Sequence, residues 1–136
     1  MVSTLERSTT IKSAKDATRL TFTRMSDDDF AAALHSAHFS GRVVASTHFS
    51  GPPSLLFDDM AASWPSWKGQ KKWAALEDDL RLTATSDSLG HITLTVAMRS
   101  ECAPATWRLT AELELLAGEL EALARSVRNV FHDQTI

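Results

Sequence analysis

Three runs of alternating apolar and polar residues, all in the second half of the sequence, restrict the fold most strongly. They lie near residues 80–84, 92–98 and 107–115, and their apolar members are Leu80, Leu82, Ala84, Ile92, Leu94, Val96, Met98, Trp107, Leu109, Ala111, Leu113 and Leu115. Strict alternation gives a β-strand one apolar and one polar face. Because residues 87–90 and 101–105 are short and rich in turn residues, the runs predict an antiparallel meander with one buried face.

A helix is predicted after the meander, beginning at Gly118-Glu119. Its apolar residues recur at helical spacing and are Leu120, Leu123, Ala124, Val127 and Phe131. This stripe fits the apolar face of the meander, and Arg125 and Arg128 suit the negative end of the helix dipole. The predicted fold class is therefore α+β: an antiparallel β-meander sheet with helices packed on one face and the C-terminal helix docked on the sheet.

The beginning of the chain predicts a hairpin after a flexible terminus. Residues 1–8 are polar and aperiodic, so we expect them to be frayed. Residues 9–14 and 18–25 alternate between apolar and polar side chains, and Lys15-Asp16 between them is a suitable turn.

The next stretch is ambiguous between helix and strand. Ser26, followed by three aspartates and the run AAAL, favours a helix over 27–37. Against this, apolar residues alternate at Phe30, Ala32 and Leu34. We prefer a β-hairpin with strands near 29–38 and 42–50 and a turn at Ser40-Gly41, and the helix remains the alternative.

A short helix is predicted over residues 55–64, with Ser54 as its N-cap. Leu56, Met60 and Trp64 recur four residues apart, and Pro65 ends the helix. The segment from residue 64 to 73, WPSWKGQKKW, is then predicted to be a loop.

Length and composition limit the class of protein. A chain of 136 residues has the size of one domain, which we take as 1–136. The net charge of −3 argues against a dedicated nucleic-acid binder, and no apolar run approaches the roughly 20 residues of a membrane span. The single cysteine, Cys102, and the absence of an apolar signal segment predict a cytoplasmic protein.

The sequence contains no recognisable catalytic or metal-binding motif. His35 and His38 would face opposite ways on a strand, and HExxH, CxxC, GxSxG and phosphate-binding glycine motifs are all missing. Cys102 lies beside the acidic Glu101, which disfavours an activated thiolate. We therefore expect no catalytic residue, no metal site and no cofactor.

Three acidic clusters occur, at residues 27–29, 58–59 and 77–79. The second suits a helix N-terminus, and the other two are typical of solvated turns. As a functional alternative, acidic patches on a small protein can cover the basic surface of a nuclease or toxin and speed the encounter.

The tryptophan-lysine segment has the most distinctive local composition. Trp64 continues an apolar helix stripe and Trp73 directly precedes a strand, so both are predicted to lie in the core. Trp67 has no periodic partner and is the best candidate for an exposed anchor at an interface. Together with Lys68, Lys71 and Lys72 it could instead stack a base or sugar beside a phosphate.

Residues 53–131 resemble a family of small actinobacterial proteins of unassigned function. The shared pattern is W-x-x-W-x-G-x-x-x-W from Trp64 and D-x-x-G-H from Asp87, between a short apolar helix and a W…L-x-L-x-x-G-E ending. Met60 and Pro65 depart from that pattern. The family is similar to immunity proteins of bacterial polymorphic and contact-dependent toxin systems. This resemblance implies a cytoplasmic binder that neutralises one toxin by covering its active site.

The leading hypothesis is a non-enzymatic protein-binding module, an immunity protein or antitoxin whose partner is a cognate toxin. The candidate partner-binding residues are Trp67, Lys68, Lys71, Lys72, Glu77, Asp78 and Asp79. The runner-up is a small-ligand or nucleotide-binding domain that uses the segment 64–73, and an enzyme with an acidic metal site comes third.

Overall fold

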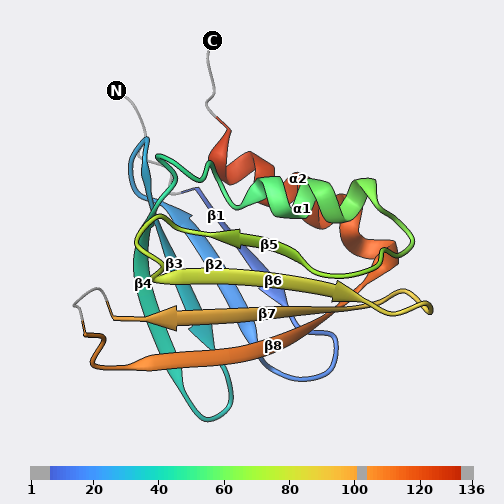
Figure 1. Ribbon diagram of the computed structural model, residues 1–136, viewed down its shortest axis with the longest axis horizontal. Coiled ribbons are helices and arrows are strands. Elements are labelled where there is room, and N and C mark those ends of the chain that lie inside the picture. Colours follow the sequence, from blue (N-terminus) through green and yellow to red (C-terminus); the bar gives the residue numbers. More distant parts are fainter. Residues whose placement is uncertain (1–6, 101–103, 133–136) are drawn as a thin grey trace.

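The computed structural model describes residues 7–100 and 104–132, which form two copies of one pattern, four antiparallel strands followed by a helix (Figure 1). The first copy consists of β1 (Ser8–Lys12), β2 (Arg19–Arg24), β3 (Asp29–His35), β4 (Ser40–Ser46) and α1 (Ser54–Ala62). The second consists of β5 (Lys71–Ala74), β6 (Leu80–Ser86), β7 (His91–Arg99), β8 (Arg108–Leu116), the short 3-10 helix η1 (Ala117–Glu119) and α2 (Leu120–Phe131). The predicted terminus 1–8 lies mostly outside the described residues, and β1 already begins at Ser8.

Each sheet is a simple meander, with strand orders β1-β2-β3-β4 and β5-β6-β7-β8. The three alternating runs form β6, β7 and β8, as predicted, and Leu82, Val96 and Ala111 lie in register across them. The predicted α+β class and the antiparallel meander of residues 80–115 are confirmed, and the structure adds β5 to that meander and a second four-stranded sheet beside it.

The inner faces of both sheets and the two helices share one hydrophobic core. It includes Ile11, Leu20, Phe22, Phe30 and Leu34 from the first sheet, and Leu82, Leu94, Val96 and Leu113 from the second. The sheets cross one another in Figure 1, and the inner faces meet closely: a Cβ on Gly41 of β4 would lie 2.2 Å from Cδ1 of Leu109 in β8. Alternation thus places these apolar side chains between the sheets.

The position of the C-terminal helix differs from the prediction. We expected α2 to cover the meander of residues 80–115, but it packs against α1 and against β1 and β2 of the first sheet. Because the first sheet was not predicted to be a complete four-stranded layer, its role in covering the second meander was missed. The two helices lie side by side at one edge of the molecule (Figure 1).

The ambiguous stretch is strand, not helix. β3 and β4 pair in register from Asp29 opposite Ser46 to His35 opposite Ser40, so the hairpin prediction is confirmed with shorter strands. The predicted turn at Ser40-Gly41 is wrong, because both residues already belong to β4.

Two local predictions around α1 are also wrong. The helix begins without a side-chain cap from Ser54: Pro53 is the N-cap, and the Pro52 and Pro53 carbonyls accept the first backbone hydrogen bonds. The segment 64–73 is not all loop, since Lys71 to Ala74 form β5 at the edge of the second sheet. No helix in the described part of the chain is long and apolar enough to cross a membrane.

Candidate functional site

Contacts with α1 fix the centre of the tryptophan-lysine segment. The Nζ atom of Lys71 lies 5.3 Å from the centroid of the Trp67 ring and 2.8 Å from Oδ1 of Asp59. Trp67 is half-buried and packs against the core. This cation-π contact and ion pair attach the segment to α1, so Trp67 and Lys71 have a structural role.

The burial of the tryptophans agrees with the prediction for Trp73 and differs from it for Trp64 and Trp67. Trp73 is buried, as expected, and its Nε1 donates to the Gly51 carbonyl at 3.2 Å. Trp64 was predicted in the core but is 60% exposed, while Trp67, predicted to be exposed, packs inward. Pro65 was the sequence signal that could have predicted the exposure of Trp64. A residue before proline is disfavoured in a helix, so Trp64 does not continue the apolar face of the helix.

The acidic residues 77–79 form the β5–β6 turn and are held by two arginines. Asp78 adopts a positive φ of 59° and forms a bidentate ion pair with Arg81 (2.7 and 2.8 Å from Nη2). Arg99 donates to the backbone carbonyls of Glu77 and Asp78, and Asp79 is buried. The candidates 77–79 are thus held by contacts separate from those of Trp67 and Lys71, whereas Lys68 and Lys72 are exposed.

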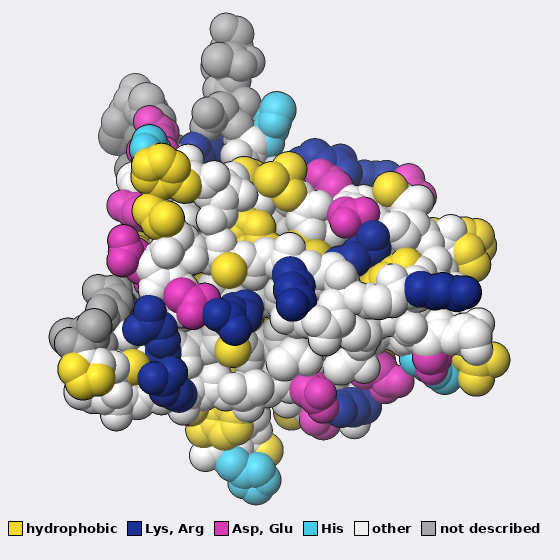
Figure 2. Space-filling view, in the orientation of Figure 1, with side chains coloured by type: hydrophobic (Ala, Val, Ile, Leu, Met, Phe, Trp, Pro, Cys, Tyr) yellow, Lys and Arg dark blue, Asp and Glu magenta, His cyan; other side chains and the backbone are white. Residues whose placement is uncertain are grey.

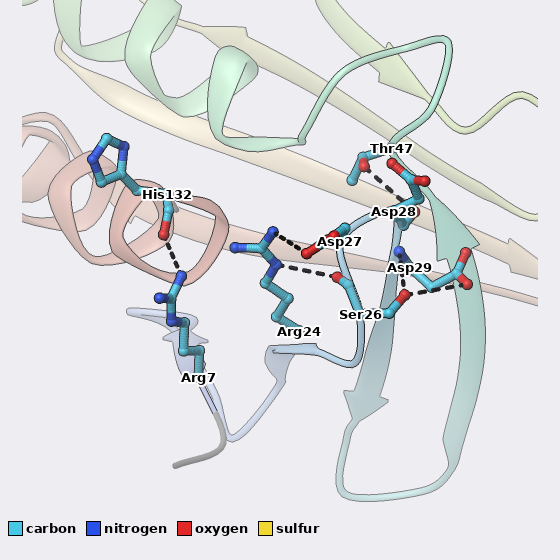
Figure 3. Close-up of polar contacts among 8 residues, drawn as sticks. All are labelled: Arg7, Arg24, Ser26, Asp27, Asp28, Asp29, Thr47 and His132. Atoms are coloured by element: carbon cyan, nitrogen blue, oxygen red, sulfur yellow. Dashed lines mark hydrogen bonds and ion pairs between the residues drawn. The ribbon is translucent and has the colours of Figure 1, made fainter. Parts of the chain in front are cut away.

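The first acidic cluster is a braced turn between β2 and β3 (Figure 3). Ser26 Oγ accepts a hydrogen bond from the Asp29 backbone N–H, and Arg24 lies 3.6 Å from the exposed carboxylate of Asp27. The Asp28 carbonyl accepts a 2.7 Å bond from the backbone N–H of Thr47. These contacts fit the expected role of turn charge.

The second acidic cluster joins the two helices. Asp58 of α1 accepts a 2.7 Å hydrogen bond from Nη2 of Arg128 in α2, and this contact raises the pKa of Arg128 above its ordinary value. Asp59 is the partner of Lys71. Within residues 7–100 and 104–132, no group of three or more His, Cys, Asp or Glu side chains is arranged to hold a metal ion.

Large apolar side chains are exposed together at one end of the molecule, where three connections converge. They are Trp64 (60% exposed), Leu89 (80%) and Leu116 (41%). A Cβ on Gly90 would lie 3.4 Å from Cβ of Ala117 and 3.8 Å from the Pro65 carbonyl oxygen, so the connections lie next to one another. We call Trp64, Leu89, Leu116 and Ala117 the apolar end. Hydrophobic side chains appear at the right of Figure 2, where these connections lie.

Two shallow hollows flank the apolar end. One, of about 480 Å³, is lined by Ala61, Trp64, Ala117, Gly118, Leu120 and Glu121. The other, of about 320 Å³, includes Leu116, Glu119 and Lys12. The exposure of Leu89 and Leu116 could have been predicted from the sequence. Leu89 lies inside a tight turn, and Leu116 directly follows Leu115 in an alternating strand, where adjacent side chains point to opposite faces.

The turn that carries Leu89 is rigidly held. Oδ1 of Asp87 accepts hydrogen bonds of 2.9 Å from the backbone N–H groups of Leu89 and His91, and its Oδ2 lies 3.0 Å from Nδ1 of His91. The bond from the His91 N–H is the main cause of a lowered pKa at Asp87. The carboxylate therefore stays ionised and keeps the turn formed near neutral pH.

The fold and surface define an α+β protein of two stacked four-stranded meanders, each followed by a helix, with an exposed apolar end. The chain belongs to DUF6228, a family of unknown function, whose family model matches residues 11–134. None of the curated proteins matches it.

A solved structure has a similar fold. The crystal structures of MRP1/MRP2 from Trypanosoma brucei superpose with a TM-score of 0.55 and 12% sequence identity, covering 95% of this chain and 86% of that chain. At this identity the similarity extends to the fold alone. Because the match covers 95% of this chain, the doubled pattern is an architecture that another protein also adopts.

Proposed function

We propose that this protein is a non-enzymatic protein-binding module and that the apolar end is its contact surface. The observation that carries the proposal is the convergence of Trp64, Leu89 and Leu116 on connections from different elements. Exposed apolar clusters rimmed by polar groups are typical of interaction surfaces, and tryptophan contributes strongly to binding energy when a partner buries it.

The rigidity of this surface favours binding. Asp87 fixes the conformation of the Leu89 turn, and Ala117 lies next to Gly90. A surface that is ordered before binding loses little conformational entropy in the complex.

The charge around the apolar end indicates the kind of partner. Asp87, Glu119 and Glu121 carry three negative charges near the apolar end, against positive charges from Lys12 and from Arg125, which lies 3.8 Å from Glu121, so the local excess is about one negative charge. The whole chain has a net charge of −3. A complementary partner has an apolar recess with a basic rim, as a nucleic-acid-cleaving toxin would.

We therefore propose that the partner is a bacterial toxin and that this protein is its cytoplasmic immunity protein. The resemblance to the small actinobacterial proteins and the acidic apolar end support this proposal. Of the residues first selected, Lys68 and Lys72 remain accessible at the rim of the tryptophan segment, while Trp67 and Lys71 support that segment.

The test begins with the genes adjacent to that of this protein, and any modular toxin domain that they encode is co-expressed with it. We expect the wild-type protein to restore growth and to bind the purified, catalytically inactivated toxin domain in calorimetry. Trp64→Ser should weaken binding at least about thirtyfold, the loss typical of a buried aromatic anchor.

Phe49→Ser is the matched control, because Phe49 is 72% exposed in the connection between β4 and α1. Absence of both protection and binding with the wild-type protein contradicts the immunity proposal. Tight binding that Trp64→Ser leaves unchanged contradicts the assignment of the apolar end.

The alternative, a nucleotide-binding platform on the tryptophan segment, has less support. Lys71 covers the Trp67 ring, and the same ammonium group is paired with Asp59. A stacked base would have to displace a lysine that already has two partners.

A further inference from the structure

Three arginines surround a small hollow on the outer face of the second sheet. The hollow has a volume of about 210 Å³ and is lined by Arg81, Arg99, Arg108, Asp78 and Thr110. It lies at the β5–β6 turn and the β7–β8 end of the sheet, opposite the end that carries Leu89 and Leu116. Figure 2 shows Lys and Arg side chains gathered at the left, over this end.

Two of the arginines repel each other unless an anion lies between them. Arg99 of β7 and Arg108 of β8 are directly opposite each other in the strand register and point to the same outer face. Like charges at directly opposite positions of an antiparallel pair destabilise a sheet. An anion between the two side chains would remove this repulsion.

The contacts of these arginines leave most of their charge uncompensated. Asp78 pairs with Arg81, so one carboxylate is already occupied. Arg99 donates to the backbone carbonyls of residues 77 and 78, which are neutral acceptors that fix its guanidinium without cancelling its charge. Arg108 forms no ion pair with any residue described by the structure, and the four charged residues that line the hollow, three arginines and Asp78, have a net charge of +2.

We propose that this hollow is a binding site for a small oxyanion that carries two or more negative charges, such as a phosphate or carboxylate compound. Guanidinium groups bind both kinds of oxygen through paired, charge-assisted hydrogen bonds. The Thr110 side chain at the edge of the hollow adds a neutral hydrogen-bonding group. The volume is smaller than a typical drug-sized pocket of about 300–1,000 Å³, which favours a compact ligand.

This inference does not depend on the proposed protein partner. The two surfaces are separated by the length of β7, nine residues, or about 30 Å at the usual rise per residue. A protein that fails to bind a toxin can still bind an anion, so the two proposals can fail separately.

The test is isothermal titration of the full chain at low ionic strength with two probes, inorganic pyrophosphate and citrate. Binding of pyrophosphate alone would identify a phosphate site, and binding of citrate alone a carboxylate site. We expect Arg108→Gln to weaken binding of the preferred probe about tenfold or more, since it removes a charge-assisted contact.

Arg19→Gln on the outer face of β2 is the matched control, because it makes the same charge change on the other sheet and should leave affinity unchanged. Equal weakening by Arg19→Gln and Arg108→Gln would show a general charge effect and overturn the site. The site would also be overturned if the wild-type protein bound neither pyrophosphate nor citrate with millimolar or tighter affinity.

Asp78→Asn provides a test in the opposite direction. Asparagine tolerates the positive φ at position 78, so the turn should remain folded. Loss of the carboxylate frees Arg81 for the ligand, and we expect affinity to increase severalfold. Unchanged or weaker binding by folded Asp78→Asn would contradict a site in which Arg81 takes part.

Thermal melting supplies a second readout. Without added anion, Arg108→Gln should melt at the same temperature as the wild-type protein or slightly higher, because the repulsion from Arg99 is gone. Pyrophosphate should raise the melting temperature of the wild-type protein more than that of Arg108→Gln. An equal rise in both proteins would overturn the proposal.

Discussion

At position 41 there is no room for a side chain in the present packing. A Cβ on Gly41 would lie 2.2 Å from Cδ1 of Leu109, closer than carbon atoms approach without a shift. Because Leu109 can change its rotamer, we expect Gly41→Ala to reduce the free energy of unfolding by about 1–3 kcal/mol rather than to prevent folding. Urea denaturation of the purified variant measures this loss.

A double-variant cycle checks the cause. Leu109→Ala opens space at the same contact, so Gly41→Ala should cost clearly less in that background than in the wild-type protein. Additive losses would mean that the contact between the sheets does not explain the effect of the alanine.

Some residue positions were predictable and others were not. Alternation placed Leu82, Leu94 and Leu113 in the core correctly. Gly41 was taken for a turn residue, because a glycine required by contact between sheets has the same local sequence signal as one in a turn. The burial of Trp64 was predicted wrongly because the apolar spacing of α1 was extended to the residue before a proline.

At the scale of elements, two leucines of α2 differ in how deeply they are buried. Leu120 is buried and Leu123 is half-buried, although the spacing of apolar residues treats them alike. Leu120→Ala should lower the free energy of unfolding by about 2–5 kcal/mol, as expected for a leucine in a core. Leu123→Ala should cost only about 1–2 kcal/mol, because much of its side chain already contacts solvent.

Chemical denaturation of the two variants under identical conditions gives this comparison. The pair is matched in chemistry and helix propensity, so the difference reports burial. A larger loss for Leu123→Ala would mean that α2 is rotated relative to the position described above.

The long strands were predictable because each has several alternating positions, and a one-residue error would expose every apolar side chain. β5 was missed for the opposite reason: in four residues it has one buried side chain, Trp73, and no measurable period. The candidate site had still weaker signals, since Trp64, Leu89 and Leu116 lie in different segments that only the tertiary fold brings together.

At the scale of the whole molecule, the aromatic residues join both halves. Phe22 and Phe30 of the first sheet contact Phe131 of α2, with ring centroids 6.0 and 5.0 Å apart. Phe22 also contacts Phe57 of α1, and Phe30 lies 6.0 Å from Trp73 of β5. The doubled pattern was not predictable from the sequence, because the two halves share topology and burial but no visible repeat of residues.

This shared core leads to a prediction about cooperativity. All four tryptophans lie between residues 64 and 107, so tryptophan fluorescence reports on the second half and on its contacts with the first. Leu20→Ala alters the first sheet, where Leu20 is fully buried in β2, and should cost about 2–5 kcal/mol. Because the aromatic contacts connect the halves, the fluorescence transition should shift by as much as the transition followed by far-UV circular dichroism. If the halves unfolded independently, the fluorescence and dichroism transitions of Leu20→Ala would no longer coincide, and the dichroism curve would split into two steps.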